Sequence, residues 1–404
     1  MRRLLSVGLL LFVVWMAPCA WAEHNREYSL PQKHYTVLQN VPDRNLTPLR
    51  KATIHQTVPV ESPVTGLPWD GDYQPVLVQI SNAVGTVKQK GGTVKAAGIG
   101  KRAPWGIQYA DILYEMLLVK SGETRFTALF SDCFAQGQPA SGVGPVRSTR
   151  IGQLLLREEW SAGFVFSGGY FVSSGRRDQD IDGQIAKIGT PEQGVLFNVQ
   201  QIRPESLRNR VMGKKAPDNL NVDIVGIRAL IPAAYVSKPR PFLFADECPY
   251  AAAYEPAEVI HVDWGQKTTI SHFVYDKNSQ TYQRYCGPGV NKAKWSPFTA
   301  LDSPEDQVSE SQQPLAFANL IIQRVLYEYE DEIFLMPNMQ VIGKGNADIF
   351  IGGRFIPGYW VRDFITGPTV FYDDQGRELM LNRGKTIIAQ FPQEGLCTFA
   401  SGLE

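Results

Sequence analysis

Short runs of apolar residues, many alternating with polar ones, follow one another along most of the chain and predict strands more often than helices. In the amino-terminal half the pattern predicts strands over 75–80, 110–119, 124–130 and 164–166, and the second and third flank the turn Ser121-Gly122 as in a hairpin. The carboxyl-terminal half is denser in such runs. Its predicted strands cover 259–264, 269–275, 281–285, 318–323, 341–345, 348–351, 359–361, 369–372 and 386–389.

One helix is predicted to begin just after the stretch from Gly144 to Arg150, because the glycine and proline at its start break a preceding strand. Ser148 is expected to cap this helix. Arg147 and Arg150 then stand at the helix start, where free backbone N–H groups and the helix dipole both favour an anion. The apolar residues that follow at helical spacing are Ile151, Leu154 and Leu155. The stretch predicts anion binding, whereas HExxH, Walker A and G-x-S-x-G motifs are all absent from the sequence.

The chain is long enough for two domains, and the stiff, polar residues at 238–241 are typical of a linker between them. We expect an amino-terminal mixed α/β domain over 62–237, with a second helix over 222–234, and a mainly β domain over 245–392. The fold class is then α+β. The flanking segments are an extended leader over 23–61 and a tail over 393–404.

The first residues have the pattern of a secretory signal peptide. Two arginines precede an apolar run over 4–16, which is short for a membrane span, and Ala20-Trp21-Ala22 matches an A-x-A cleavage site. We expect cleavage after Ala22 and an extracytoplasmic location: secreted, periplasmic or in the cell envelope. Cys19 raises the alternative of a lipoprotein, but the proline before it is unlike the small residue that lipid-transfer processing prefers. No later run is long and apolar enough for a transmembrane helix in the mature chain.

Charge and composition argue against two classes of protein: nucleic-acid-binding proteins and disordered proteins. Lysine and arginine number 40, as do aspartate and glutamate, and removal of the signal leaves 40 − 2 = 38 basic against 40 acidic residues. This balance argues against a nucleic-acid-binding protein. Hydrophobic residues make up 44% of the chain, which indicates folded rather than disordered material.

Cysteine spacing and one acidic run indicate whether the sequence predicts a metal site. The four cysteines after the signal, at 133, 248, 286 and 397, include no C-x-x-C pair, so a zinc site is not expected. A Cys248–Cys286 disulfide and buried thiols both remain open. Asp178, Asp180 and Asp182 begin like a calcium loop, but the twelfth position is a glycine, so we expect neither a metal nor a cofactor.

Three charged residues interrupt predicted strands: Asp111, Glu115 and Arg125. Such charges are seldom buried without a partner. Pairing of the two strands in an even register would place Glu115 and Arg125 on one face, and an ion pair between them is the favoured interpretation. The alternative is that Glu115 or Asp111 acts as a catalytic acid or base.

Two further features have a plain and a functional interpretation. The glycine-rich stretch 88–102 carries five basic residues and no acid, and is expected to be a solvated loop or a flap over an anionic ligand. His261 and Asp263 lie two apart on a predicted strand and so share a face, where a lone histidine is more often structural than catalytic.

The chain resembles a bacterial family, the YerB-like proteins, which are envelope lipoproteins of unknown function. The resemblance extends from about residue 62 to 392, and its most specific element is 144–150, which is similar to the family's G-P-V-R-S-A-R. Residues 110–115 resemble A-D-I-V-Y-E, and 124–126 match T-R-F. Further matches lie at Pro63–Pro68, Pro75–Asn82, Gly168-Gly169, Asn319–Gln323, Gly343–Gly345, Trp360 and Gly384–Thr386.

The chain departs from this family in two places. Pro217-Asp218-Asn219-Leu220 stands where the family has P-H-N-L, which removes the histidine that any proton transfer there would need. The lipobox around Cys19 is degraded, which argues against a lipid anchor. The resemblance implies a two-domain architecture and an envelope location, and it implies no substrate.

We therefore expect a non-enzymatic envelope protein that binds an anionic component, such as wall glycan, peptide or a lipid headgroup. The candidate ligand-binding residues are Arg147, Arg150, Arg125, Ser148, Asn82 and Asn219. Two alternatives remain open: a wall-polymer-processing enzyme that uses Glu115 or Asp111, and a scaffold whose charges are all internal. The sequence does not indicate an oligomeric state.

Overall fold

The structure is a computed structural model. It describes residues 33–34, 61–89, 92–169, 185, 194–239, 242–246, 248–250, 254–306, 313–329 and 337–403. The expected signal peptide and most of the leader lie outside these residues, as do Asp178, Asp180 and Asp182. None of the described helices has the length and apolar character needed to cross a bilayer.

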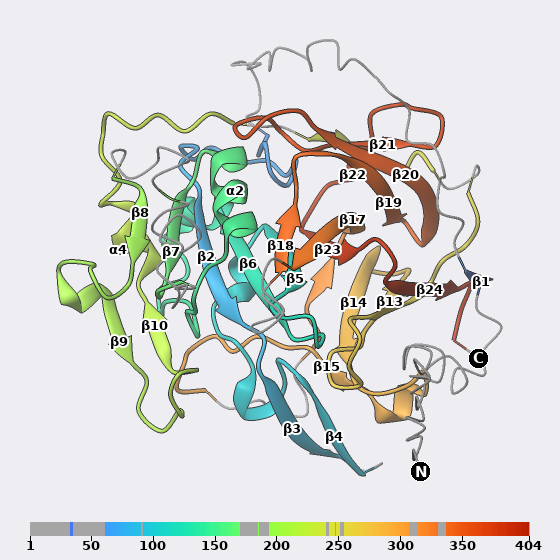
Figure 1. Ribbon diagram of the computed structural model, residues 1–404, viewed down its shortest axis with the longest axis horizontal. Coiled ribbons are helices and arrows are strands. Elements are labelled where there is room, and N and C mark those ends of the chain that lie inside the picture. Colours follow the sequence, from blue (N-terminus) through green and yellow to red (C-terminus); the bar gives the residue numbers. More distant parts are fainter. Residues whose placement is uncertain are drawn as a thin grey trace, which may run out of the picture. The chain divides into compact units, whose positions relative to one another are not determined.

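One mixed sheet runs through both halves of the chain (Figure 1). From edge to edge it consists of β21 (Val370–Asp373), β20 (Arg354–Arg362), β19 (Gly343–Ile351), β17 (Asn319–Tyr329), β23 (Thr386–Pro392), β5 (Ile112–Leu117), β6 (Thr124–Phe130), β2 (Val76–Ser81), β7 (Gly163–Phe166) and β8 (Leu196–Asn198), with β18 (Pro337–Gln340) beside β17. Strand β23 comes late in the chain, yet it lies between β17 and β5 and runs parallel to both. The two halves expected from the sequence therefore share one sheet, and Gln32–Glu404 form one compact unit.

A second sheet is antiparallel throughout. It contains β1 (Lys33–His34), β24 (Leu396–Ala400), β12 (Val259–Asp263), β13 (Ser271–Asp276), β14 (Thr281–Cys286) and β15 (Ser296–Pro297), with β16 (Ala316–Phe317) beside β14. Two-stranded ladders are formed by β3 (Val84–Gln89) with β4 (Gly92–Ala97), β9 (Arg208–Arg210) with β10 (Leu220–Val222), and β11 (Leu243–Ala245) with β22 (Met380–Asn382).

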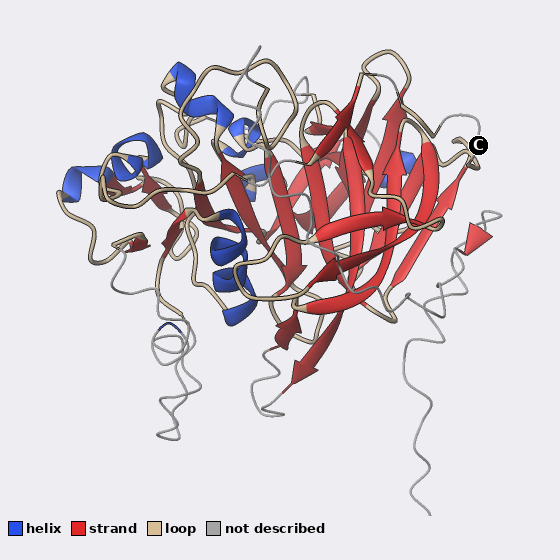
Figure 2. Ribbon diagram, turned by 90° about the horizontal axis from the view of Figure 1, so that it is seen from above, coloured by secondary structure: helices blue, strands red, loops and turns tan. Residues whose placement is uncertain are grey.

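Helices are few and short in the described residues (Figure 2). They are α2 (Ile151–Trp160), α4 (Ile224–Arg228) and the 3-10 turns η1 (Gly100–Arg102), η2 (Ile107–Tyr109), η3 (Asp132–Gln136), η5 (Glu205–Leu207) and η6 (Lys292–Lys294). Helix α2 is fixed to the large sheet at its carboxyl-terminal end. The indole Nε1 of Trp160 donates to the hydroxyl of Tyr114 over 2.7 Å, and Glu159 Oε2 pairs with Arg362 Nη1 over 3.1 Å.

The central strands are buried on both faces. Successive side chains of a strand point to opposite faces, so alternate residues enter different cores. On β2, Val78 packs in the same core as Phe273 of the second sheet, whereas Leu77 packs in the core that contains Leu154 of α2. Burial on both sides explains why apolar residues occupy consecutive positions in these strands, such as Val76–Val78 of β2 and Ala128–Phe130 of β6.

Most of the predicted strands are present. The strand predicted over 124–130 has the same bounds in β6, and the one predicted over 75–80 is β2, shifted by one residue. The two segments at 341–345 and 348–351 form one longer strand, β19. The chain is α+β with strand predominating, and its described amino-terminal half has a mixed sheet rather than a regular alternation of strands and helices.

Three predicted segments differ from the structure. The described residues of 88–102 are mostly not a loop: buried Val94 and Ala96 alternate with exposed Lys95, and residues 88–89, 92–97 and 100–102 belong to β3, β4 and η1. The helix expected over 222–234 is shortened to α4: it starts later because Val222 belongs to β10 and Asp223 is the N-cap, and it ends at Arg228. The tail over 393–404 contains β24, which pairs with β12.

Cys133, Cys286 and Cys397 are buried free thiols. The Cys248–Cys286 disulfide, one of the two alternatives left by the sequence, is not formed.

Candidate functional site

The β5–β6 register separates the two charges that were expected to pair. Met116 lies opposite Arg125, and Glu115 lies opposite Phe126. Directly opposite residues share a face and neighbours alternate, so Glu115 and Arg125 point to opposite faces of the large sheet. The expected Glu115–Arg125 ion pair is therefore wrong.

Arg125 is a buried cation without a carboxylate. Its Nη1 donates to the carbonyl oxygen of Ser148 over 2.6 Å and to the Ser148 hydroxyl over 2.8 Å. The residue is 3% exposed, its Nε has no acceptor, and no described carboxylate forms an ion pair with it. Burial lowers the pKa of the Arg125 guanidinium, and the charges of Arg150 and Arg147 lower it further. The charges of Asp218 and Glu123 oppose this effect without forming an ion pair with Arg125. Arg125 is therefore a buried charge without an ion-pair partner among the described residues, and a negative guest would offset it.

Helix α2 begins beside this cation. Its N-cap is Arg150, whose backbone N–H donates to Gln153 Oε1 over 2.7 Å. The expectation that Ser148 caps the helix is wrong, because Ser148 lies two residues before the cap. Its hydroxyl instead accepts from Arg125 and, over 3.2 Å, from Nη1 of Arg150. Ser148 thus brings two guanidinium groups together at the helix start.

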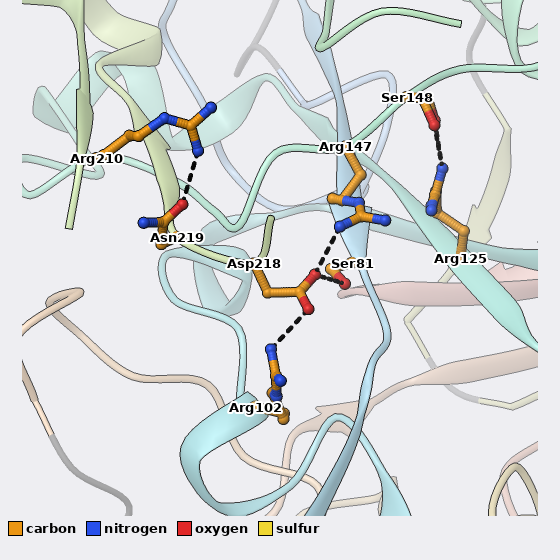
Figure 3. A network of polar contacts seen from close by, with 8 residues as sticks. All are labelled: Ser81, Arg102, Arg125, Arg147, Ser148, Arg210, Asp218 and Asn219. Atoms are coloured by element: carbon orange, nitrogen blue, oxygen red, sulfur yellow. Dashed lines mark hydrogen bonds and ion pairs between the residues drawn. The ribbon is translucent and has the colours of Figure 1, made fainter. Parts of the chain in front are cut away.

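Arg147 faces Asp218 rather than Ser148 (Figure 3). Asp218 Oδ1 lies 3.1 Å from Arg147 Nη1 and accepts from the Ser81 hydroxyl over 2.7 Å, while Oδ2 lies 2.7 Å from Arg102 Nη1. The side chains of Arg147 and Arg102 are 25% and 30% exposed, so both can be reached from water. The sequence indicated Arg102 only as the end of the basic stretch 88–102, one interpretation of which was a flap over an anionic ligand. It did not indicate Ser81, and the signal for Asp218 was the aspartate at the P-H-N-L position.

The backbone around residue 144 sets the position of Arg147. The segment 143–147 runs between β2 and β10, with Val146 bridged to Ile80 and the Arg147 N–H donating to Gln79 O over 2.9 Å. Gly144 allows this close approach. A Cβ at that position would lie 2.4 Å from the ring of Trp105 and 2.5 Å from a backbone oxygen of β10.

The two candidate asparagines have different partners. Asn219 Oδ1 accepts from Arg210 Nη1 over 2.8 Å, beside Asp218 (Figure 3). Asn82 is not part of this cluster: its Nδ2 donates to Thr124 Oγ1 over 2.7 Å and to Glu115 Oε1 over 3.2 Å. The structure therefore groups Arg125, Arg150 and Ser148, with Arg147 nearby. It places Asn219 with Arg210 and Asn82 with Glu115.

Glu115 faces the second sheet. Its Oε2 lies 2.8 Å from Arg284 Nη2, and both side chains are almost fully buried. Its Oε1 accepts from the Thr124 hydroxyl over 2.8 Å. Burial raises the pKa of Glu115, and the charge of Arg284 opposes this. A carboxylate sealed between two sheets by an arginine lacks the access to a substrate that acid–base catalysis requires.

Asp111 is also buried and engaged. Its Oδ2 accepts the backbone N–H groups of Ser131 over 2.7 Å and Asp132 over 3.0 Å. Burial, and then the charge of Asp132, raise the pKa of Asp111 to about 8, against a smaller opposing effect of Lys385. These contacts tie the start of β5 to the turn after β6, which is a structural role. Within the described ranges, no group of three or more histidine, cysteine or acidic side chains is placed to hold a metal ion.

Comparison with known proteins gives the following similarities. The model described as "Protein of unknown function (DUF3048) N-terminal domain" matches residues 98–236, and "Protein of unknown function (DUF3048) C-terminal domain" matches 260–388. The crystal structure of the YerB protein from Bacillus subtilis is 22% identical, with a TM-score of 0.60, and the similarity covers 84% of this chain and 99% of that one. At this identity the likeness concerns the fold. No curated protein matches the chain.

Proposed function

Since the chain belongs to the two-domain, YerB-like DUF3048 family of proteins of unknown function, we propose its function from the site itself. It is a non-enzymatic protein that binds an anionic component of the cell envelope through the cluster of Arg125, Arg147, Arg150 and Ser148. Guanidinium groups donate in a fixed fork and form charge-assisted hydrogen bonds, each worth roughly 1.5–3 kcal/mol.

The burial of Arg125 without a carboxylate carries this proposal. Buried charges in proteins are normally paired, because an isolated ion loses its hydration without compensation. Arg125 has only Ser148 oxygens as partners in the described part of the chain, and its Nε has none. An anionic guest would supply the missing charge, and the partly exposed Arg147 beside it gives access from solvent.

The envelope location is the part of the proposal that rests on the sequence. A positively charged start, a short apolar run and Ala20-Trp21-Ala22 are typical of an exported protein. Wall glycan, peptides and lipid headgroups are the anionic components that such a protein meets. The enzyme alternative has no support from the geometry, since Glu115 and Asp111 both face inward.

Thermal-shift measurements on the protein test the proposal. Phosphate, sulfate, citrate and acetate are added at constant ionic strength, and at least one is expected to raise the melting temperature through binding to the folded state. Arg147→Gln is expected to reduce the shift strongly. Arg377→Gln is the matched control, because it removes an exposed guanidinium from another part of the chain. The proposal fails if no anion stabilises the protein, or if the shift in Arg147→Gln equals that of the parent protein.

A further inference from the structure

The charges at the site do not balance. Arg102, Arg125 and Arg147 have one ion-pair carboxylate among the described residues, Asp218, so two of the three guanidinium groups lack an ion-pair carboxylate of their own. The charge of Glu123 also acts on Arg125, but the two side chains form no ion pair. Arg102 and Arg147 share that carboxylate, at 2.7 Å and 3.1 Å, and Arg125 forms no ion pair with a carboxylate in the described part of the chain. A guest with two negative charges would neutralise the group, whereas a single carboxylate would leave it half compensated.

The carboxylate position beside Arg147 is already filled. Both oxygens of Asp218 are in use: one accepts from Arg147 and Ser81, the other from Arg102. A carboxylate guest would compete there with one held by the chain itself, at the high effective concentration of a tethered group. Arg125, whose buried Nε has no acceptor, and Ser148 lie on the side of Arg147 away from Asp218 (Figure 3).

Those donors come from different directions. Arg125 extends from β6, Arg147 and Ser148 belong to the segment before α2, and Arg102 lies on η1. A planar carboxylate is satisfied by the fork of one guanidinium. A phosphate group carries terminal oxygens that diverge in three dimensions, so it can accept from several arginines at once.

We infer that the guest is a phosphate group with two negative charges, bound between Arg125 and Arg147 beside the Ser148 hydroxyl. This inference rests on the proposed function and narrows it to one chemical class. Asp218 then acts as a selectivity residue: it orders Arg102 and Arg147 while it disfavours carboxylates and singly charged anions.

Calorimetric titration of the protein with inorganic phosphate, acetate and succinate, at equal ionic strength, tests the inference. Phosphate is expected to bind at least tenfold more tightly than either carboxylate. Arg147→Gln is expected to weaken phosphate binding by about ten- to a hundredfold, the loss of one charge-assisted contact. Asp218→Asn is expected to reduce the preference for phosphate over succinate, because the competing carboxylate is gone.

The outcomes separate the two proposals. Acetate or succinate binding as tightly as phosphate, with the same sensitivity to Arg147→Gln, would overturn the phosphate assignment and leave anion binding intact. Binding of no probe would overturn both. Sedimentation with phosphatidic acid vesicles, compared with titration by diphosphate, then identifies the source of the phosphate. Vesicle binding that diphosphate displaces indicates a lipid headgroup, and diphosphate binding without vesicle binding indicates a free phosphate compound.

Discussion

The carboxylate of Glu115 on β5 and the guanidinium of Arg284 on β14 form an ion pair, with 2.8 Å between Oε2 and Nη2 and almost no exposure of either side chain. The pair crosses from the large sheet to the second sheet. Arg284 also lies over the rings of Phe298 and Phe126, at 4.3 Å and 4.9 Å from their centroids. One interaction thus connects residues that belong to the two separate family domains.

Removal of either partner is expected to destabilise the protein strongly. Glu115→Gln leaves the Arg284 charge buried without a counterion, and loss of one partner of a buried pair typically costs about 3–5 kcal/mol. Arg284→Met is expected to cost less than Glu115→Gln, because the buried Glu115 can take up a proton whereas an arginine stays charged. Urea unfolding measures both. Lys277→Ala, which breaks an exposed pair with Glu258, is the control, and its cost is expected to stay below about 1 kcal/mol.

Replacement of Arg125, unlike replacement of Glu115 or Arg284, is expected not to destabilise the protein. Arg125→Met removes a buried charge that has no described carboxylate, so the free energy of unfolding should change by less than about 1 kcal/mol or increase. Phosphate binding should be lost in the same variant. Urea unfolding in a buffer free of phosphate and sulfate, followed by titration with phosphate, measures both effects. A loss of stability comparable to that of Glu115→Gln would mean that Arg125 is compensated within the fold, and the binding site would lose its main support.

The Asp111 carboxyl is expected to make stability fall as pH rises. Its pKa is raised to about 8 in the folded protein, from 3.8, so between these values the folded state binds more protons than the unfolded state. The Asp111 carboxyl therefore makes its full contribution to the free energy of unfolding below pH 3.8, and this contribution is lost progressively up to about pH 8. Asp111→Asn keeps an acceptor for the N–H groups of Ser131 and Asp132 without the charge. The difference in unfolding free energy between the variant and the parent should therefore grow in favour of the variant from about pH 4 to about pH 8. A difference that does not change with pH would contradict the shift.

His261 and His272 are expected to have the opposite effect on the pH dependence of stability: they should make stability fall as pH is lowered. Their Nδ1 atoms are 2.7 Å apart, and Nε2 of His272 donates to the carbonyl oxygen of Gly287 over 2.8 Å, so the neutral His272 accepts from His261. Burial lowers the pKa of His261 to about 4 and that of His272 well below its ordinary value. As pH falls from about 6.5 to about 4, the unfolded state takes up protons that the folded state does not, and stability should decrease by on the order of 3 kcal/mol for His261. Imidazole NMR signals of both residues should stay in the neutral position at pH 5. A titration midpoint near 6.5 for either would refute this.

The local sequence pattern was enough to predict the strand and the helix that carry or adjoin the residues of the site. The apolar run over 124–130 predicted β6 with the bounds it has, and the spacing after Arg150 predicted the helix α2. Both depend on neighbouring residues only: alternation marks a strand, and a period of three to four marks a helix. The same information placed Arg147 and Arg150 at a helix start.

The partners of the charges could not be predicted in this way. A shift of one residue in the β5–β6 register exchanges the two faces, so the sequence could not decide whether Glu115 and Arg125 meet. Arg284 follows Glu115 by 284 − 115 = 169 residues, and Asp218 follows Arg147 by 218 − 147 = 71. Neither pairing leaves a local pattern.

The sequence by itself determined where strands and the longer helix form and which residues carry charge into them, because these properties depend on side chains a few positions apart. Only the tertiary structure decided that β23 joins the two halves into one sheet, that Arg284 neutralises Glu115, and that Arg125 is left without a carboxylate. The physical reason is that pairing between distant strands is set by the total burial that a given arrangement achieves, a property of the whole chain rather than of any segment.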